Sequence, residues 1–165
     1  MAAISSSDQK PVRGRARAAA AMSGAPAAEA GLAEFADFVR LGPIAQSREI
    51  RLGLDAQIVG RVAAAILNTS VQSLLASLRI PSSTLTRKLA AGDRLSSGES
   101  DRVSRVILIH AHATDVFESR DLAAQWMQTP HAELDDEMPV AMLDTQTGYD
   151  EVQRILHRIE FGIGV

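Results

Sequence analysis

The apolar residues of this chain recur with the period of an α-helix. The clearest case is the segment 147–161, in which Val152, Ile155, Leu156 and Ile159 follow the i, i+3, i+4, i+7 spacing of one helical face. No segment sustains the period of two that a half-buried strand requires, so we predict no β-strand. The chain is therefore expected to adopt an all-α fold.

Capping residues and helix breakers divide the rest of the chain into further helices. Ser96 and Glu99 have the S-x-x-E spacing of a capping box, which predicts a long helix that ends near Phe117 or Glu118. Ser82 is expected to cap a helix that runs to about residue 91. The remaining predicted helices are 27–41, 55–67, 70–78, 121–127 and 138–143.

Residues 1–27 are mostly small or polar and include three arginines, Arg13, Arg15 and Arg17. Nothing in this segment can bury an apolar face, so we predict a flexible, disordered arm. The arginines suit either a solubilising tail or an arm that enters the minor groove of DNA. A helical segment, residues 28–44, is expected to follow the arm.

Length and composition favour a cytoplasmic protein with no membrane partner. The 165 residues contain no cysteine, no evident signal peptide and no apolar run near the ~20 residues of a membrane span.

Residues 52–114 carry seven Lys or Arg and four Asp or Glu, whereas residues 115–165 carry three and eleven. Halves of opposite charge suggest two partners of opposite charge, although a balance that serves only solubility is the alternative.

The segment 70–91 has the pattern of a helix–turn–helix motif. Its second helix begins Ser-Ser-Thr at residues 82–84 and carries Arg87 and Lys88 on its outer side. In such motifs this helix enters the major groove, where hydroxyls reach base edges or phosphates and cations neutralise phosphates. Arg79 stands in the turn, where glycine is frequent, at a cost of roughly 1 kcal/mol. A plain helical hairpin shares the pattern and remains the alternative.

The sequence contains no catalytic or cofactor-binding motif that we can identify. His110 and His112 lie two residues apart on a predicted helix and therefore point to different faces. His157 and Glu160 share a face at i, i+3, and a surface contact is the default interpretation of that spacing. We therefore predict a protein that is not an enzyme, with no metal site and no cofactor.

Two sets of residues resemble the MbcA/ParS/Xre antitoxin family, over roughly residues 52–165. Residues 80–89, 95–103 and 113–117 are similar to the Xre-like region of that family. The second set resembles its toxin-binding module and is the more specific, because a proline, an L-D-T-x-x-G step and a helix that ends in glycine occur at fixed spacing. This set comprises Trp126, Pro130, Leu134, Pro139, Leu143-Asp144-Thr145, Gly148, Val152, Leu156, Ile159-Glu160 and Gly162.

The resemblance implies an all-helical antitoxin that pairs with a RES-domain toxin. Such toxins act on NAD, by degrading it or by transferring its ADP-ribose, and the last helix and tail of the antitoxin block the toxin's active site. The helix–turn–helix region of such antitoxins binds the promoter DNA of its own operon, usually as a homodimer or as the toxin complex. The resemblance thus implies an Xre-like domain at residues 45–119 and a toxin-binding domain at residues 120–165.

The resemblance also implies site residues. For DNA they are Ser82, Ser83, Thr84, Thr86, Arg87 and Lys88. For the toxin they are Arg154, Arg158, Ile159, Glu160, Phe161, Gly162, Ile163, Gly164 and Val165. A tail with apolar anchors, close-approaching glycines and a terminal carboxylate suits a pocket that binds an anionic dinucleotide. The alternative function is a stand-alone transcriptional repressor whose acidic half serves only dimerisation.

Overall fold

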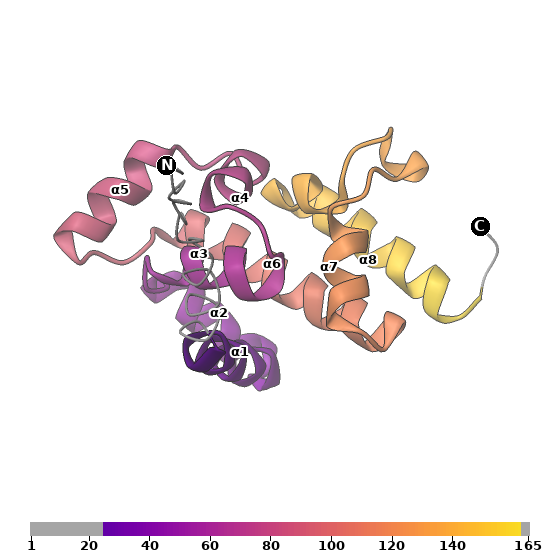
Figure 1. Cartoon of the computed structure of the whole chain (residues 1–165), viewed down its shortest axis with the longest axis horizontal. Coiled ribbons are helices and arrows are strands. Elements are labelled where there is room, and N and C mark those ends of the chain that lie inside the picture. Colours follow the sequence, from indigo (N-terminus) through magenta and orange to yellow (C-terminus); the bar gives the residue numbers. More distant parts are fainter. Residues whose placement is uncertain (1–24, 163–165) are drawn as a thin grey trace, which may run out of the picture.

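The long helix α6 (Ser97–Phe117) runs through the middle of the molecule, and helices from both sides of it in the sequence pack against it (Figure 1). The computed structural model describes residues 25–162, with side chains from Gly31 onward. The predicted capping box is present: the Ser96 hydroxyl accepts from the Glu99 N–H at 3.3 Å, and the Glu99 carboxylate accepts from the Ser96 N–H at 2.6 Å. The predicted start and end of this helix are confirmed.

Two helices, rather than one, precede α3 (Ile58–Arg61). Helix α1 (Ala25–Arg40) begins two residues before the predicted one, so the last residues of the predicted arm 1–27 are helical, and residues 1–24 lie outside the described range. The predicted helical segment 28–44 is interrupted after α1, and α2 (Pro43–Leu52) begins with a proline at its first turn. The sequence pattern missed α2 because none of its residues is buried.

The predicted helix 55–67 is divided into α3 (Ile58–Arg61) and a π-helical turn, η1 (Val62–Ile66). The N–H of Leu67 donates to the carbonyl of Val62, five residues earlier, at 3.3 Å. The wider turn still directs Ile58, Val62, Ile66 and Leu67 inward, and all four are buried as predicted.

Helices α4 (Val71–Ser77) and α5 (Ser82–Ala91) follow, joined by residues 78–81. Ser70 caps α4 by accepting from the N–H of Ser73. The predicted cap of α5 is wrong: Pro81 occupies the N-cap without a side-chain hydrogen bond, and Ser82 is the first helical residue. Pro81 enforces the extended backbone there, which leaves the Ser82 hydroxyl free of a capping role.

The acidic part of the chain comprises α7 (Arg120–Met127), the short 3₁₀ helices η2 (Ala132–Leu134) and η3 (Pro139–Asp144), and α8 (Gln146–Glu160). The prediction of helices at 121–127, 138–143 and 147–161 is close, and η2 was not predicted. Over the described residues only two isolated β-bridges and no strand occur, so the all-α prediction is confirmed.

One continuous hydrophobic core extends from Phe35 in α1 to Leu156 in α8. The two halves of the chain meet on α6, which contributes Val103 and Val106 toward the N-terminal end of the helix and Ala113 toward its C-terminal end, all fully buried. Among residues 25–162 no single helix is long and apolar enough to cross a membrane. One pair of helical segments, Ile58–Ile66 and Val71–Ser77, has the required length and apolarity when taken together, but the pair is sharply bent.

Candidate functional site

The residues predicted to bind partners lie on two helices at opposite ends of the molecule. Figure 1 places α5 at one end of the longest axis and the C-terminal end of α8 at the other. The predicted DNA-binding residues therefore lie together on α5, the described toxin-binding residues lie on or just after α8, and the structure does not bring these two groups to each other.

The turn before α5 has the left-handed backbone expected at Arg79. Its φ angle is +52°, which is unfavourable for a residue with a Cβ atom. Two contacts support this conformation: the guanidinium of Arg102 donates to the carbonyls of Leu78 and Arg79, both at 3.2 Å, and Arg79 pairs with Asp144 at 2.8 Å. Arg79 therefore links the turn to the acidic part of the chain.

Helix α5 is anchored by one buried side chain, Leu85. Ser82, Ser83 and Arg87 are exposed on its outer surface. Thr86 is also exposed, and its hydroxyl donates to the carbonyl of Ser82 at 3.0 Å. The helix therefore presents short hydroxyl side chains and a guanidinium to solvent, which are groups that can contact phosphates or base edges.

Lys88 does not lie on the outer side as the sequence predicted. Its side chain is only 14 % exposed, because the ammonium donates to the carbonyl of Arg94 at 3.0 Å and pairs with Glu99 at 3.4 Å. Burial raises the pKa of Glu99, but hydrogen bonds from Ser96 and the charge and hydrogen bond of Lys88 outweigh burial and lower this pKa. Lys88 thus ties the end of α5 to the start of α6. Thr84 is also half-buried.

The L-D-T-x-x-G step sets the position of α8. Leu143 is fully buried, and Thr145 caps the helix by accepting from the N–H of Gly148 at 3.1 Å. A Cβ atom on Gly148 would lie 2.0 Å from the carbonyl oxygen of Met142, so only glycine fits this close approach. Asp144 is the residue that pairs with Arg79.

Two arginines of α8 are held by acidic neighbours. Arg154 donates to Glu151 at 3.0 Å, and this hydrogen bond is the main cause that lowers the pKa of the Glu151 carboxyl. Arg158 forms an ion pair with Glu133 of η2, so it links the last helix to the preceding loop. Ile159 is half-buried against the core.

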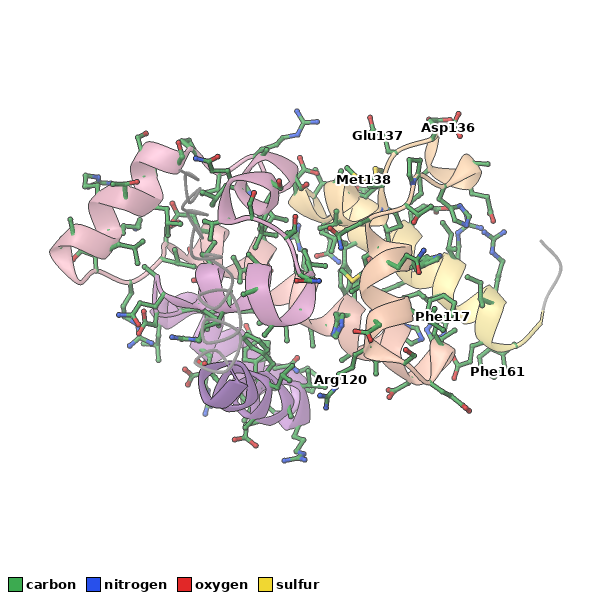
Figure 2. The ribbon with its side chains drawn as sticks, viewed as in Figure 1. Phe117, Arg120, Asp136, Glu137, Met138 and Phe161 are labelled. Carbon is green, nitrogen blue, oxygen red and sulfur yellow. The ribbon has the colours of Figure 1, made fainter. Side chains whose placement is uncertain are left out.

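An exposed aromatic side chain, Phe161, follows the last turn of α8. Phe161 is 68 % exposed, and Figure 2 shows it at the C-terminal end of α8. Gly162 follows with a left-handed φ of +60°, as expected for the residue that ends the helix. The predicted tail residues Ile163, Gly164 and Val165 lie outside the described residues.

An open groove of about 480 Å³ lies along this face of α8. The residues that line it come from successive turns of the helix and end at the exposed phenylalanine. They are Tyr149, Asp150, Gln153, Arg154, His157, Arg158 and Phe161.

The structure also brings together a cluster that the sequence did not predict. His112 of α6 lies against His157 and Glu160 of α8, with its Nε2 atom 3.5 Å from the carboxylate of Glu160. The spacing of His157 and Glu160 predicted a surface contact between those two alone. The third member comes from packing between distant segments, which no spacing along one helix reveals. His110, by contrast, is buried in the core.

Comparison with known proteins assigns a domain to this part of the chain. Residues 112–162 match the antitoxin Xre/MbcA/ParS C-terminal toxin-binding domain. The match begins within α6 and ends at Gly162, so it contains the L-D-T-x-x-G step, the groove and Phe161.

Curated relatives are similar over longer segments. An antitoxin Xre of Photorhabdus laumondii is 37 % identical over 79 residues, which cover 47 % of this chain and 53 % of the relative. An antitoxin Xre of Yersinia enterocolitica is 34 % identical over 91 residues, or 54 % and 62 %. The chain thus spans little more than half the length of these two relatives.

A third relative aligns with most of its length. The Prs ADP-ribosylating antitoxin of a Sphingobium species is 26 % identical over 132 residues, which cover 74 % of this chain and 82 % of the relative. The matched domain and the relatives agree with each other: residues 112–162 are similar to the toxin-binding domain of Xre/MbcA/ParS antitoxins, and the relatives themselves are named antitoxins.

Proposed function

We propose that this protein is an antitoxin that binds a cognate RES-domain toxin through the last turns of α8 and the residues that follow. The observation that carries this proposal is the exposure of Phe161 beside the groove, within the segment that matches a toxin-binding domain. Aromatic side chains are favoured at the centres of protein interfaces, where they bury a large area at a small entropic cost. Exposure in the free chain is otherwise unfavourable for such a residue.

The charge of this part of the chain fits a toxin that consumes NAD. A pocket for a dinucleotide needs cationic groups for the phosphates, and residues 115–165 carry eleven acidic against three basic residues. Glu160 is exposed on the last turn and is placed to meet such a pocket. Arg154 is exposed and can contact the toxin. Arg158 pairs with Glu133, and Ile159 packs against the core, so these two residues hold the surface in position.

In this proposal neutralisation is steric. Ile163, Gly164 and Val165 would extend from Gly162 into the toxin's active site and keep NAD out, and this chain would contribute no chemistry. Residues 120–165 would then act on the toxin, and residues 45–119 would act on promoter DNA, both in the cytoplasm and with the antitoxin as a homodimer.

Replacing Phe161 by alanine tests the toxin surface. We expect the affinity for the purified toxin, measured by calorimetry, to fall by about 2 kcal/mol, or roughly thirtyfold, because a central interface aromatic is lost. Ile44→Ala is the matched control, because Ile44 is 71 % exposed on α2, outside the matched domain. Equal affinities for the two variants would refute the proposed surface.

Ending the chain after Glu160 tests the steric mechanism. The core of α8 stays intact in this variant, so its circular dichroism should match the full chain while co-produced toxin consumes NAD. If the toxin stays inactive with the truncated chain, the residues after Glu160 do not block its active site.

DNA binding is the second proposed activity, and the exposed hydroxyls and Arg87 on α5 favour it. Arg87→Ala should weaken promoter binding for all sequences alike and reduce the salt slope by about 1, as expected for a lost phosphate contact. Lys88→Ala is the comparison, because the contacts of Lys88 with Glu99 and Arg94 leave it less available to DNA. If a mobility-shift assay shows no specific shift, toxin binding remains as the single proposed activity. A specific shift from a chain that does not bind the toxin would favour the stand-alone repressor.

A further inference from the structure

The side chains of His112, His157 and Glu160 lie together between the end of α8 and the C-terminal part of α6. The carboxylate of Glu160 lies 3.5 Å from Nε2 of His112 and 3.4 Å from Nδ1 of His157. The two imidazole rings are tilted by 56°, with their centroids 4.7 Å apart. Two ring nitrogen atoms and one carboxylate oxygen atom therefore lie together, all within 4.8 Å of one another.

These separations are at the long limit for hydrogen bonds, and they also fit two ligands of one metal ion. A charge-assisted hydrogen bond between imidazole and carboxylate has a length of about 2.7–2.9 Å, well below the observed 3.4 and 3.5 Å. Two ligand atoms that each lie about 2.1 Å from a tetrahedral zinc ion are about 3.4 Å apart. The spacing of the carboxylate from both rings matches this value.

A second set of contacts orients His112 for this task. The Nε2 amide group of Gln153 donates to the hydroxyl of Tyr149 at 2.7 Å, which turns the Oε1 atom of Gln153 toward Nδ1 of His112 at 3.1 Å. Because that oxygen can only accept, Nδ1 carries the proton and the lone pair of Nε2 points to the cluster. A ligand histidine whose other ring nitrogen donates to a protein oxygen is the usual arrangement around a metal.

We propose that His112, His157 and Glu160 bind a divalent transition-metal ion, with Zn²⁺ as the ion that best suits two imidazoles and one carboxylate. Three protein ligands leave a fourth position for water or for a group of a partner. The ion joins the last turn of α8 to α6, two elements that also meet through the core and through the contact of His112 with Gln153. Mg²⁺, which prefers oxygen ligands and octahedral geometry, does not fit the site.

The site has a consequence for the neighbouring surface. The ring of His157 stacks on that of Phe161, with centroids 6.4 Å apart and 23° between the planes. Metal binding therefore fixes the aromatic side chain at the end of α8. This consequence rests on the proposed function, whereas the metal site itself does not.

Calorimetric titration of the full chain, produced without a polyhistidine tag, tests the site with ZnCl₂ and with MgCl₂. We expect one Zn²⁺ per chain and no heat with Mg²⁺. His112→Ala, His157→Ala and Glu160→Gln should each weaken Zn²⁺ binding at least tenfold. The chain has four histidines, and His131→Gln is the matched control, which should bind as the unmodified chain does, because His131 is the N-cap of η2 and does not belong to the cluster.

Nitrogen chemical shifts of the histidine side chains provide the decisive readout, because they identify which ring atom is coordinated. Zn²⁺ should shift Nε2 of His112 and Nδ1 of His157 and leave His131 unchanged. Absence of Zn²⁺ binding, binding that the Glu160→Gln and His157→Ala variants retain, or shifts at His131 instead would overturn the proposal. Glu160 and His157 are exposed, so these two variants keep the test valid even if His112→Ala fails to fold. Failure of toxin binding in the Phe161→Ala experiment would leave this result unaffected.

Discussion

Helices α5 and α8 carry the two proposed binding surfaces, and they are attached to the molecule in different ways. α5 buries one residue, Leu85, and is tied to α6 by Lys88, whereas α8 buries Gly148, Val152, Ile155 and Leu156 and adds the ion pair of Arg158 with Glu133. Because α5 buries so little, its exposed residues can be substituted with little loss of stability. On α8 this freedom is limited to the exposed positions between the four buried residues and to the last turn.

The largest change in stability is expected from Gly148→Ala, in the first turn of α8. The new methyl would lie 2.0 Å from the Met142 carbonyl oxygen, so the first turn of α8 must move and we expect a loss of about 3 kcal/mol in the free energy of unfolding. Gly98→Ala in the first turn of α6 is the matched control. Nothing lies within 4 Å of its added methyl, and alanine should stabilise that helix by up to about 1 kcal/mol. Urea unfolding of both variants measures the difference.

The next largest loss in the free energy of unfolding is expected from the one buried side chain of α5. Leu85→Ala should cost about 2.5 kcal/mol, because it removes the one buried side chain of this helix. Leu89→Ala on the same helix should cost less than about 0.5 kcal/mol, because Leu89 is largely exposed. Hydrogen exchange of the α5 amides should increase in the first variant only. If Leu85→Ala changes stability as little as Leu89→Ala does, other contacts hold α5 and the contrast with α8 is wrong.

The sequence predicted most helices because one face of each is buried. The stripe on α8 and the capping box of α6 are local signals, and both are confirmed. Helix α2 was missed because it has no buried residue, so no apolar stripe marks it. The π-turn at Val62–Ile66 was missed because one extra residue in the turn leaves the inward positions almost unchanged.

For the candidate site, the sequence predicted residues on single helices and missed those joined by tertiary packing. Phe161 and Gly162 followed from the end of a helical pattern. His112 joins His157 and Glu160 only because α6 and α8 pack together. Lys88 was assigned to the outer surface because its partner, Glu99, lies beyond a turn whose geometry the sequence does not state.

A smaller effect is expected from pH, through His110 on the helix that joins the two ends. Burial lowers the pKa of His110 below its usual value near 6.5; a hydrogen bond with the backbone of Arg120, labelled in Figure 2, opposes this change, and the charge of Arg120 adds to it. The unfolded chain therefore takes up its proton first, so this part of the stability is complete above about pH 6.5 and decreases as the pH falls below it. His110→Gln should flatten this dependence in urea unfolding from about pH 7.5 to 5.5. A variant with the slope of the unmodified chain would exclude His110 as its origin.

The smallest effect should come from the ion pair between Arg79, in the turn before α5, and Asp144, at the end of η3. Arg79→Gly removes an unfavourable left-handed backbone, a gain of roughly 1 kcal/mol, but it also gives the unfolded chain more freedom and leaves Asp144 without its partner. The side chain of Arg79 is 80 % exposed, so the pair itself contributes only about 0–1 kcal/mol. These terms oppose each other, and the net change should stay within about 1 kcal/mol of zero. A double-mutant cycle with Asp144→Asn isolates the pair. A coupling energy well above about 1 kcal/mol would mean that the ion pair, and not the core on α6, connects the turn before α5 to α8.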